Sequence, residues 1–473
     1  MMKTLALIDI AEATDGQAHL SGVAECEFSR VNTDTRSLKE GDLFVALKGE
    51  RFDAHDFLQD VAQKKAAAAV VDRFIEGVKL PQLVVKNTTK ALGDIAMYNR
   101  DLFSGSLVGI TGSCGKTTVK AMLKNIFEQA SSQEAVLATE GNFNNHIGVP
   151  LTLFNLNPQH QYAVVEMGAS GAGEIKYLSA MSKPDVVVVT NALQAHVEGF
   201  GSLAGIAKAK GELFEFLKDD GVAVINRDDP AFDQWISLLE NNTSKNLKVI
   251  TFSASDSVRT SDRNNYLDFN AIGVSEGPKG NVEFVMNIPG DEVVVRLQLL
   301  GKQNVSNALA AAACAFSVGI DAENIKKGLE NTIAVPGRMC PISGINNSLI
   351  IDDSYNANPD SVKAAIDALS QWTSNTFLVL GDLGELGEKE EQLHADLGEY
   401  AKRKNIQHLL TVGELTKATS LSFGEKAVHC KNQEELIKMI SAMLDDKSVV
   451  LVKGSRVSKM DKVVAALKDG GEN

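Results

Sequence analysis

The feature that most constrains this fold is an apolar run that leads directly into a glycine turn and then into a helical pattern. Residues 106–111 read SLVGIT, and residues 111–118 read TGSCGKTT. Glycines allow successive backbone N–H groups to converge on one phosphate, and the N-terminus of the next helix adds a favourable dipole. The stretch therefore predicts a buried strand, a phosphate-binding turn and a helix, in the order typical of α/β proteins.

The side chains of this turn suit a phosphate and its metal ion. Lys116 can place a cation on the β- and γ-phosphates of a nucleotide, and Thr117 can place a hydroxyl on Mg²⁺. The general phosphate-loop pattern asks for a glycine at position 110, where this chain has Ile110. The strict pattern is not met, but a Gly-Lys-Thr-Thr core between a strand and a helix still indicates phosphate binding.

Short β-branched runs alternate with helical patterns over most of the 473 residues. This length is about three times the ~150 residues that a single domain typically has. A Ser-Gly-Ser stretch at 104–106 and the pair Pro336-Gly337 interrupt the alternation. We therefore predict α/β domains with largely parallel sheets at 1–104, 105–335 and 336–473. Within the second domain, residues 266–300 have the alternating pattern of hairpin strands.

Charge and composition limit the kinds of partner. Aspartate and glutamate number 61 against 47 lysines and arginines, a net charge of −14, which argues against nucleic acid or an anionic membrane as the main partner. The five cysteines are odd in number and contain no C-x-x-C pair, so we expect neither a disulfide framework nor a zinc site. No run approaches the ~20 apolar residues of a membrane span. These features predict a soluble, cytoplasmic protein.

Three further positions carry candidate ligands. Glu166 ends the apolar run YAVVE, and a carboxylate at a strand end beside a phosphate loop suits Mg²⁺. His196 follows the apolar run at 185–191, at the strand edge where ligands gather in open α/β sheets. Lys208 and Lys210, in AKAKGE, have the pattern of a solvated helix face. The residues alone leave the roles of this histidine and of both lysines open.

Motifs distributed over the whole chain resemble those of the Mur ligases, ATP-dependent enzymes that form the amide bonds of the peptidoglycan peptide. In chain order they are TGSCGKTT (111–118), EMGAS (166–170), NALQAHVEGFGS (191–202), AKAKGE (207–212), NVSNALAA (304–311), PGRM (336–339), DDSYNANP (352–359) and VKGSR (452–456). The resemblance implies an N-terminal UDP-binding domain, a central ATPase domain with a mostly parallel sheet and a C-terminal Rossmann-like domain.

Two more motifs, GNFNNHIGVPLT (141–152) and GDLGELG (381–387), resemble those of the family members that accept D-alanyl-D-alanine. The implied substrates are this dipeptide and a UDP-N-acetylmuramoyl tripeptide, and the implied protein is a monomer. The implied reaction passes through an acyl phosphate and releases ADP and phosphate. Activation is needed because a carboxylate is a poor electrophile until its oxygen belongs to a phosphate leaving group.

The resemblance also implies roles for individual residues. The catalytic residues would be Lys116, Glu166, His196 and Lys210. Two Mg²⁺ ions would bind, one at Thr117 and Glu166 and one at His196. Lys210 matches a lysine that CO₂ carbamylates in this family, and the carbamate would be a further metal ligand. The implied ATP contacts are Gly112, Ser113, Cys114, Gly115, Lys116, Thr117, Thr118, Asn304, Asn307, Arg338 and Asp353, with Asp352 as the alternative to Asp353.

Substrate contacts are implied in every domain. The matched positions are Thr35, Arg36, Lys48, Gly49, Asn144, Asn145, Asn356, Asn358, Asp382, Lys453 and Arg456. Those in the C-terminal domain would hold the acceptor, because a zwitterionic dipeptide needs a cation for its carboxylate and acceptors for its ammonium.

The sequence leaves other functions open besides the addition of D-alanyl-D-alanine. One is another enzyme of the same superfamily, either the ligase that adds a diamino acid or a folylpolyglutamate synthase. The chain has YNANPDS (355–361) where the diaminopimelate-adding enzymes have a D-N-P-R-type stretch. Another is a phosphate-loop switch or motor, which would not require NALQAHVEGFGS or a third domain. A non-catalytic scaffold would not require an intact phosphate loop.

Overall fold

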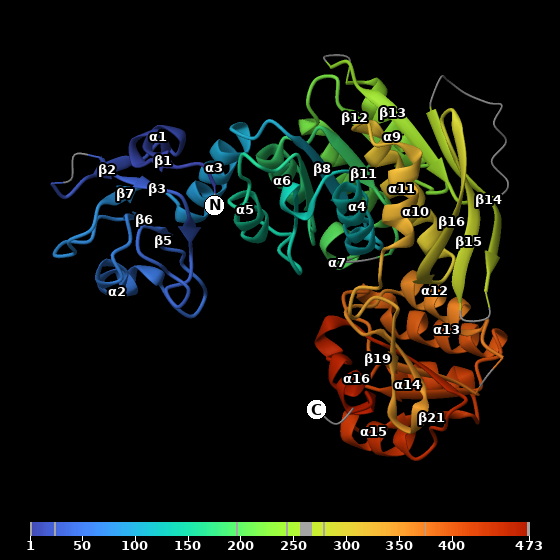
Figure 1. The fold of residues 1–473 in the computed structure, drawn as a ribbon. Helices are drawn as coiled ribbons and strands as arrows, with labels where there is room; N and C mark the ends of the chain where they lie inside the picture. The colour runs from blue at the N-terminus through green and yellow to red at the C-terminus, as the bar shows by residue number, and fades with distance from the viewer. Residues whose placement is uncertain are drawn as a thin grey trace.

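The computed structural model of this chain describes residues 2–22, 25–194, 197–242, 245–255, 267–277, 280–373 and 375–470. Figure 1 shows an N-terminal, a central and a C-terminal body, each built round a β-sheet. The central body contacts both of the others, and the N-terminal body projects to the side. The α/β architecture predicted from the sequence is confirmed.

The N-terminal sheet has the strand order β2-β7-β6-β5-β4, parallel except at β2. Strands β5 and β6 are apolar and fully buried, as expected for a parallel sheet that is covered on both faces. The elements are β1 (Leu5–Ala6), α1 (Leu7–Ala13), β2 (Gln17–His19), β3 (Glu27–Phe28), β4 (Val31–Asn32), β5 (Leu43–Val45), α2 (Leu58–Gln63), β6 (Ala68–Val71), β7 (Gln82–Val84) and α3 (Thr88–Asp101).

The central sheet has the order β16-β15-β14-β13-β12-β11-β8-β10-β9. The strands from β9 to β14 are parallel, and β14, β15 and β16 are antiparallel hairpin strands, which confirms the pattern predicted for 266–300. The bounds are β8 (Ser106–Thr111), β9 (Val136–Ala138), β10 (Tyr162–Glu166), β11 (Val186–Val189), β12 (Val222–Asn226), β13 (Lys248–Ser253), β14 (Leu267–Glu276), β15 (Asn281–Ile288) and β16 (Asp291–Leu300).

Helices cover both faces of the central sheet (Figure 1). One face packs against α4 (Lys116–Ala130), α10 (Gln303–Ser317) and α11 (Ala322–Glu330). The alanines of α10 are buried from Ala308 to Ala315, and their small side chains let the helix lie close to the sheet. The other helices are α5 (Gly148–Leu153), α6 (Glu174–Ser182), α7 (Val197–Phe200), α8 (Leu203–Gly211) and α9 (Phe232–Glu240).

The C-terminal sheet has the order β17-β18-β22-β19-β20-β21 and is parallel except at β17. Its elements are β17 (Cys340–Ser343), β18 (Leu349–Asp353), α12 (Pro359–Leu369), β19 (Asn375–Gly381), α13 (Glu390–Arg403), β20 (His408–Val412), α14 (Thr416–Phe423), β21 (Ala427–Cys430), α15 (Gln433–Ser441), β22 (Ser448–Lys453) and α16 (Asp461–Leu467).

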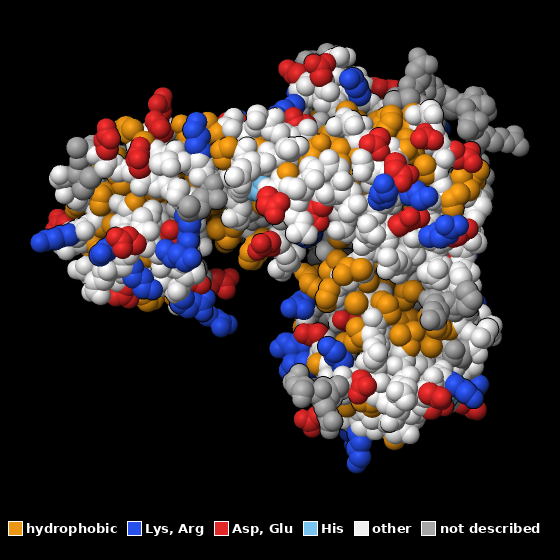
Figure 2. Space-filling model, in the orientation of Figure 1, with side chains coloured by type: hydrophobic (Ala, Val, Ile, Leu, Met, Phe, Trp, Pro, Cys, Tyr) orange, Lys and Arg blue, Asp and Glu red, His pale blue; other side chains and the backbone are white. Residues whose placement is uncertain are grey.

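Helix α3 links the first two bodies, because it packs against α1 on one side and against α5 and α6 on the other. The domain limits at 104/105 and 335/336 stay predictions. Figure 2 shows a wide hollow between the N-terminal and C-terminal bodies, with lysine and arginine side chains on both of its sides. Among the described residues, no helix is both long enough and apolar enough to span a membrane.

Candidate active site

The phosphate loop lies between β8 and α4, as the sequence predicts. Gly115 has a φ of +85°, the left-handed conformation that favours glycine, and it sits directly before the first residue of α4. A Cβ atom at Gly115 would also collide with the side chain of Asn307 on α10. The loop backbone is therefore shaped to approach a ligand closely, at the positive end of the α4 dipole.

Residues after the neighbouring strand β11 hold this loop in place. Asn191 accepts a hydrogen bond from the backbone N–H of Cys114 at 2.9 Å, and the Thr190 hydroxyl donates to the Cys114 carbonyl at 2.6 Å. The Ser113 hydroxyl donates to the Leu193 carbonyl at 2.9 Å. Asn191 was not predicted as a site residue, although its place after a buried parallel strand is a signal that indicates one.

Lys116 begins α4, and its Nζ donates to the carbonyl of Gly112 at 2.5 Å. Burial lowers the pKa of this lysine, while the nearby carboxylate of Glu166 acts in the opposite direction. The ammonium therefore lies inside the loop, where phosphate oxygens would meet it.

Glu166 ends β10 and is 2% exposed. Its Oε1 accepts a hydrogen bond from Asn144 at 2.9 Å and another from the Thr117 hydroxyl at 3.4 Å. Burial raises the pKa of this carboxyl, but the charges of Lys120 and Lys116 outweigh it, so the pKa lies below its ordinary value. The group is therefore ionised at neutral pH.

Glu166 and Thr117 offer oxygen atoms that fit a metal ion. The Oε2 of Glu166 is buried and lies 3.0 Å from the Nζ of Lys120. A carboxylate beside a threonine hydroxyl supplies the oxygen donors that Mg²⁺ prefers. Thr117 and Glu166 therefore fit one predicted Mg²⁺. The residue predicted for the second ion, His196, lies outside the described residues.

Lys210 lies on α8 and is 4% exposed, whereas Lys208 is solvent-exposed. The Lys210 Nζ is 5.9 Å from the centroid of the Phe200 ring, and no hydrogen-bond or ion-pair partner is found for it in the described part of the chain. Burial, with the nearby charge of Lys116, lowers the pKa of Lys210 to about 7. The solvated-face pattern thus describes Lys208 and not Lys210.

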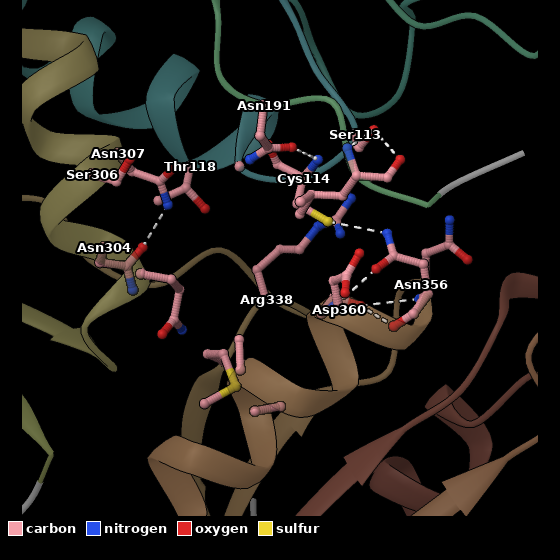
Figure 3. Close-up of a pocket in the computed structure, with 18 of the residues that line it drawn as sticks. Ser113, Cys114, Thr118, Asn191, Asn304, Ser306, Asn307, Arg338, Asn356 and Asp360 are labelled. Atoms are coloured by element: carbon pink, nitrogen blue, oxygen red, sulfur yellow. Dashed lines mark hydrogen bonds between the residues drawn. The ribbon is translucent and has the colours of Figure 1, made fainter. Parts of the chain in front are cut away.

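A cavity of about 320 Å³ lies where the central and C-terminal bodies meet. Figure 3 shows Arg338 between the phosphate loop, with Ser113 and Cys114, and the Asn356–Asp360 segment. On α10, Asn307 donates to Asn304 at 2.9 Å. Of the predicted site residues, the cavity brings together Ser113, Cys114, Gly115, Thr118, Asn304, Asn307, Arg338, Asp353, Asn356, Asn358 and Lys453.

Two domain models match this chain: the Mur ligase middle domain over residues 110–315 and the Mur ligase glutamate ligase domain over residues 337–456. A relative from Escherichia coli (strain K12), the UDP-N-acetylmuramoyl-tripeptide--D-alanyl-D-alanine ligase, is 41% identical over 99% of this chain and 100% of its own length. This chain belongs to the Mur ligase family. The enzyme of the same name from Haemophilus influenzae is 38% identical over 96% of both chains.

Solved structures agree with this assignment. A crystal structure of MurF from Acinetobacter baumannii is 34% identical, covers 98% of both chains and has a TM-score of 0.89. MurF ligase from Thermotoga maritima in complex with ADP is 27% identical, with a TM-score of 0.79, and covers 92% of this chain and 96% of that one. The fold and the family predicted from the sequence are confirmed.

The C-terminal part of this Mur ligase contributes a buried ion pair to the cavity. Lys453 Nζ lies 2.6 Å from Asp353 Oδ2 and donates to the Asn356 carbonyl at 2.9 Å. Asp353 also accepts from the backbone N–H of Met339 at 3.2 Å, beside Arg338, whose guanidinium lies 4.2 Å from the centroid of the Tyr355 ring. The pair thus fixes the backbone that carries Arg338.

Replacing Lys453 with methionine is expected to destabilise the C-terminal domain by about 3–5 kcal/mol, because it leaves the Asp353 carboxylate buried without its cation. Urea unfolding followed by tryptophan fluorescence and circular dichroism measures the change. Lys462→Met, at an exposed position of α16, is the matched control. Equal unfolding midpoints for the two variants would contradict the expectation.

The other substrate-binding residues predicted in the C-terminal domain do not all lie at the cavity. Asp382 accepts a hydrogen bond from the backbone N–H of Thr416 at 2.9 Å, so its carboxylate faces the start of α14 and does not line the cavity. Arg456 is exposed, 5.4 Å from the Tyr355 ring centroid. Asn358 caps α12, and its Nδ2 donates to Cys114 Sγ at 3.1 Å, a direct contact between the central and C-terminal bodies.

The predicted substrate residues of the N-terminal domain lie apart from this cavity. The Thr35 carbonyl accepts from Lys64 at 2.6 Å, and Arg36 is exposed and pairs with Asp34. Lys48 forms a β-bridge with Asp53, and Gly49 closes the same turn. In the central body, Asn144 contacts Glu166 as described above, and Asn145 accepts hydrogen bonds from backbone N–H groups at the start of α5.

Proposed function

We propose that this Mur ligase joins D-alanyl-D-alanine to a UDP-N-acetylmuramoyl tripeptide, with conversion of ATP to ADP and phosphate, in cytoplasmic peptidoglycan precursor synthesis. The observation that carries the proposal is the full-length similarity to D-alanyl-D-alanine ligases of the family, together with the cavity built from the phosphate loop, α10 and the C-terminal domain. We further propose that the enzyme acts as a monomer, with domains at 1–104, 105–335 and 336–473.

In the proposed reaction, a carboxylate oxygen of the tripeptide attacks the γ-phosphorus of ATP, and ADP leaves. The amine of D-alanyl-D-alanine then attacks the acyl carbon of the resulting acyl phosphate. The tetrahedral intermediate expels phosphate, the amine loses a proton, and an amide bond remains. Both partners of the first step are anions, so cationic groups must offset their repulsion.

The residues of this chain supply those cations. Lys116 lies within the phosphate loop, and Arg338 lines the cavity beside that loop from the C-terminal domain. Magnesium bound at Thr117 and Glu166 would neutralise phosphate charge. The Asn304 and Asn307 amides, which can donate and accept, suit an adenine edge. Asp353 lies where a ribose hydroxyl could donate to it, and Asp352 is the alternative.

The finer assignments are part of the same proposal. A second Mg²⁺ would bind at His196, with the carbamate of Lys210 as an additional ligand; the buried, low-pKa amine of Lys210 supports this role. The donor nucleotide would contact Thr35, Arg36, Lys48 and Gly49. The acceptor would bind at the C-terminal residues Asn356, Asn358, Asp382, Lys453 and Arg456, with Asn144 and Asn145 beside the donor.

A phosphate-release assay tests the function. With ATP, Mg²⁺ and a UDP-N-acetylmuramoyl tripeptide, we expect phosphate release to require D-alanyl-D-alanine and to match the amide product one to one. A diamino acid, with the corresponding dipeptide nucleotide, and glutamate, with a folate, serve as competing substrate sets. Turnover with one of these competing sets and none with D-alanyl-D-alanine would show that the chain is the diamino-acid-adding ligase or a folylpolyglutamate synthase instead. Phosphate release without any acceptor would favour a phosphate-loop switch or motor.

A further inference from the structure

A buried lysine one helical turn beyond Lys116 has no part in the reaction as derived so far. Lys120 lies on α4 and is 7% exposed. Its Nζ is 3.0 Å from Glu166 Oε2 and donates to the backbone carbonyl of Gly141 at 3.1 Å. Lysine is seldom buried unless it is paired. These two contacts therefore account for the position of the ammonium group.

Both contacts belong to segments at one edge of the central sheet. Gly141 opens the loop Gly141–Asn145, which follows β9, and Glu166 ends β10. Strands β9, β10 and β8 are parallel neighbours, so this loop stands at the same sheet edge as the phosphate loop. Ligands of open α/β sheets gather at that edge.

The loop Gly141–Asn145 is fastened to Glu166 through several bonds. Asn144 Nδ2 donates to Glu166 Oε1 at 2.9 Å, and the Gly168 N–H donates to the Asn144 carbonyl at 2.8 Å. Lys120 adds a further connection, because its Nζ contacts both the carbonyl of Gly141 and the Oε2 of Glu166. Because Glu166 is almost fully buried, removal of the ammonium leaves Oε2 without its charged partner.

We propose that Lys120 is a positioning residue that joins the loop Gly141–Asn145 to the carboxylate of Glu166, and so aligns the carboxylate of the donor substrate with the phosphate loop. The inference rests on the proposed function, because there the donor carboxylate must reach the γ-phosphate at this sheet edge. Lys120 itself touches neither substrate nor nucleotide.

The test compares Lys120→Met with Lys120→Arg, which keeps the cation, and with Lys124→Met on the same helix. Lys124 is a matched control because its side chain is half exposed and, among the described residues, pairs only with Glu128 in the next turn. We expect Lys120→Met to lower kcat/KM for the donor by about 10- to 100-fold, the range found for groups that orient metal ligands. The arginine variant should recover a substantial part of that loss.

Hydrogen exchange of the ligand-free proteins, read by mass spectrometry, provides a measurement that needs no turnover. In Lys120→Met, we expect amides of residues 140–146 to exchange about tenfold faster, as for the loss of one hydrogen bond to a charged group. Exchange in β8 and α10 should match the wild type. Should Lys120→Met not fold, the uncharged Lys120→Gln replaces it in both measurements.

The outcomes separate the two hypotheses. Exchange of the loop equal to that of Lys124→Met overturns the inference, and so does unchanged kcat/KM for the donor. Faster exchange throughout the central sheet would make Lys120 a structural residue and would also overturn it. If the wild type makes no product from D-alanyl-D-alanine, the proposed function fails, while the exchange comparison still decides the role of Lys120.

Discussion

Lys116→Ala is expected to reduce ligation by about 10³-fold while the protein stays folded. Lys116 supplies the charge inside the phosphate loop, and losing one pre-positioned donor to transition-state charge costs up to about that factor. In the part of the chain that the structure describes, its Nζ makes one hydrogen bond, to the Gly112 carbonyl, so alanine removes few of the contacts that hold the fold. Coupled detection of ADP measures the activity, and circular dichroism during thermal unfolding monitors the fold.

Lys124→Ala is the control for Lys116→Ala, because it removes an exposed lysine from the same helix. It should ligate at the wild-type rate. Loss of cooperative unfolding in Lys116→Ala would show that this lysine holds the loop together. Retention of more than about a tenth of the activity would contradict its role at the phosphates, since a tenfold change is only about 1.4 kcal/mol.

The local fold of the phosphate loop could be predicted because its signals are local. An apolar run ends at Thr111, the glycines follow, and α4 begins at Lys116 in the structure. The positive φ of Gly115 and the start of α4 can both be predicted from neighbouring residues in the sequence. The strand at Glu166 was predictable for the same reason, since a continuous apolar run marks a buried parallel strand.

Partners that are distant in sequence were harder to predict. Asp353 and Lys453 belong to two separate motifs, DDSYNANP and VKGSR, and nothing local indicates that β18 and β22 are neighbours. Their parallel register sets Asp353 directly opposite Lys453, 100 residues away in the chain. The motifs therefore predict separate ligand roles for the two residues, and the structure shows that they also form one ion pair.

The burial of lysines on helices was also hard to predict from the local sequence. Lys120 and Lys210 both have the sequence context of exposed helix residues, yet both are buried, because α4 and α8 pack closely against other elements on those sides. For Lys210, only the family resemblance separated it from Lys208. The physical difference between the two lysines, burial and a lowered pKa, becomes visible only once α8 is packed.

Lys210→Ala is expected to lower ligation by about 100-fold, and acetate is expected to restore part of the activity. In the proposed form, the neutral amine adds to CO₂ and releases a proton, which leaves a carbamate that can take the place of a carboxylate ligand. With a pKa of about 7, roughly a tenth of this amine is neutral at pH 6 and roughly nine tenths at pH 8. Labelling with ¹³CO₂ should therefore increase from pH 6 to pH 8 at fixed dissolved CO₂.

Lys208→Ala is the matched control, because Lys208 is exposed and lies on the same helix, two residues before Lys210. It should keep wild-type activity and show no response to acetate. Full activity of Lys210→Ala would refute the carbamate. Rescue of Lys208→Ala by acetate would move the modification to that lysine. A ¹³C signal that is the same at both pH values would contradict the lowered pKa, since a protonated ammonium has no electron pair with which to attack CO₂.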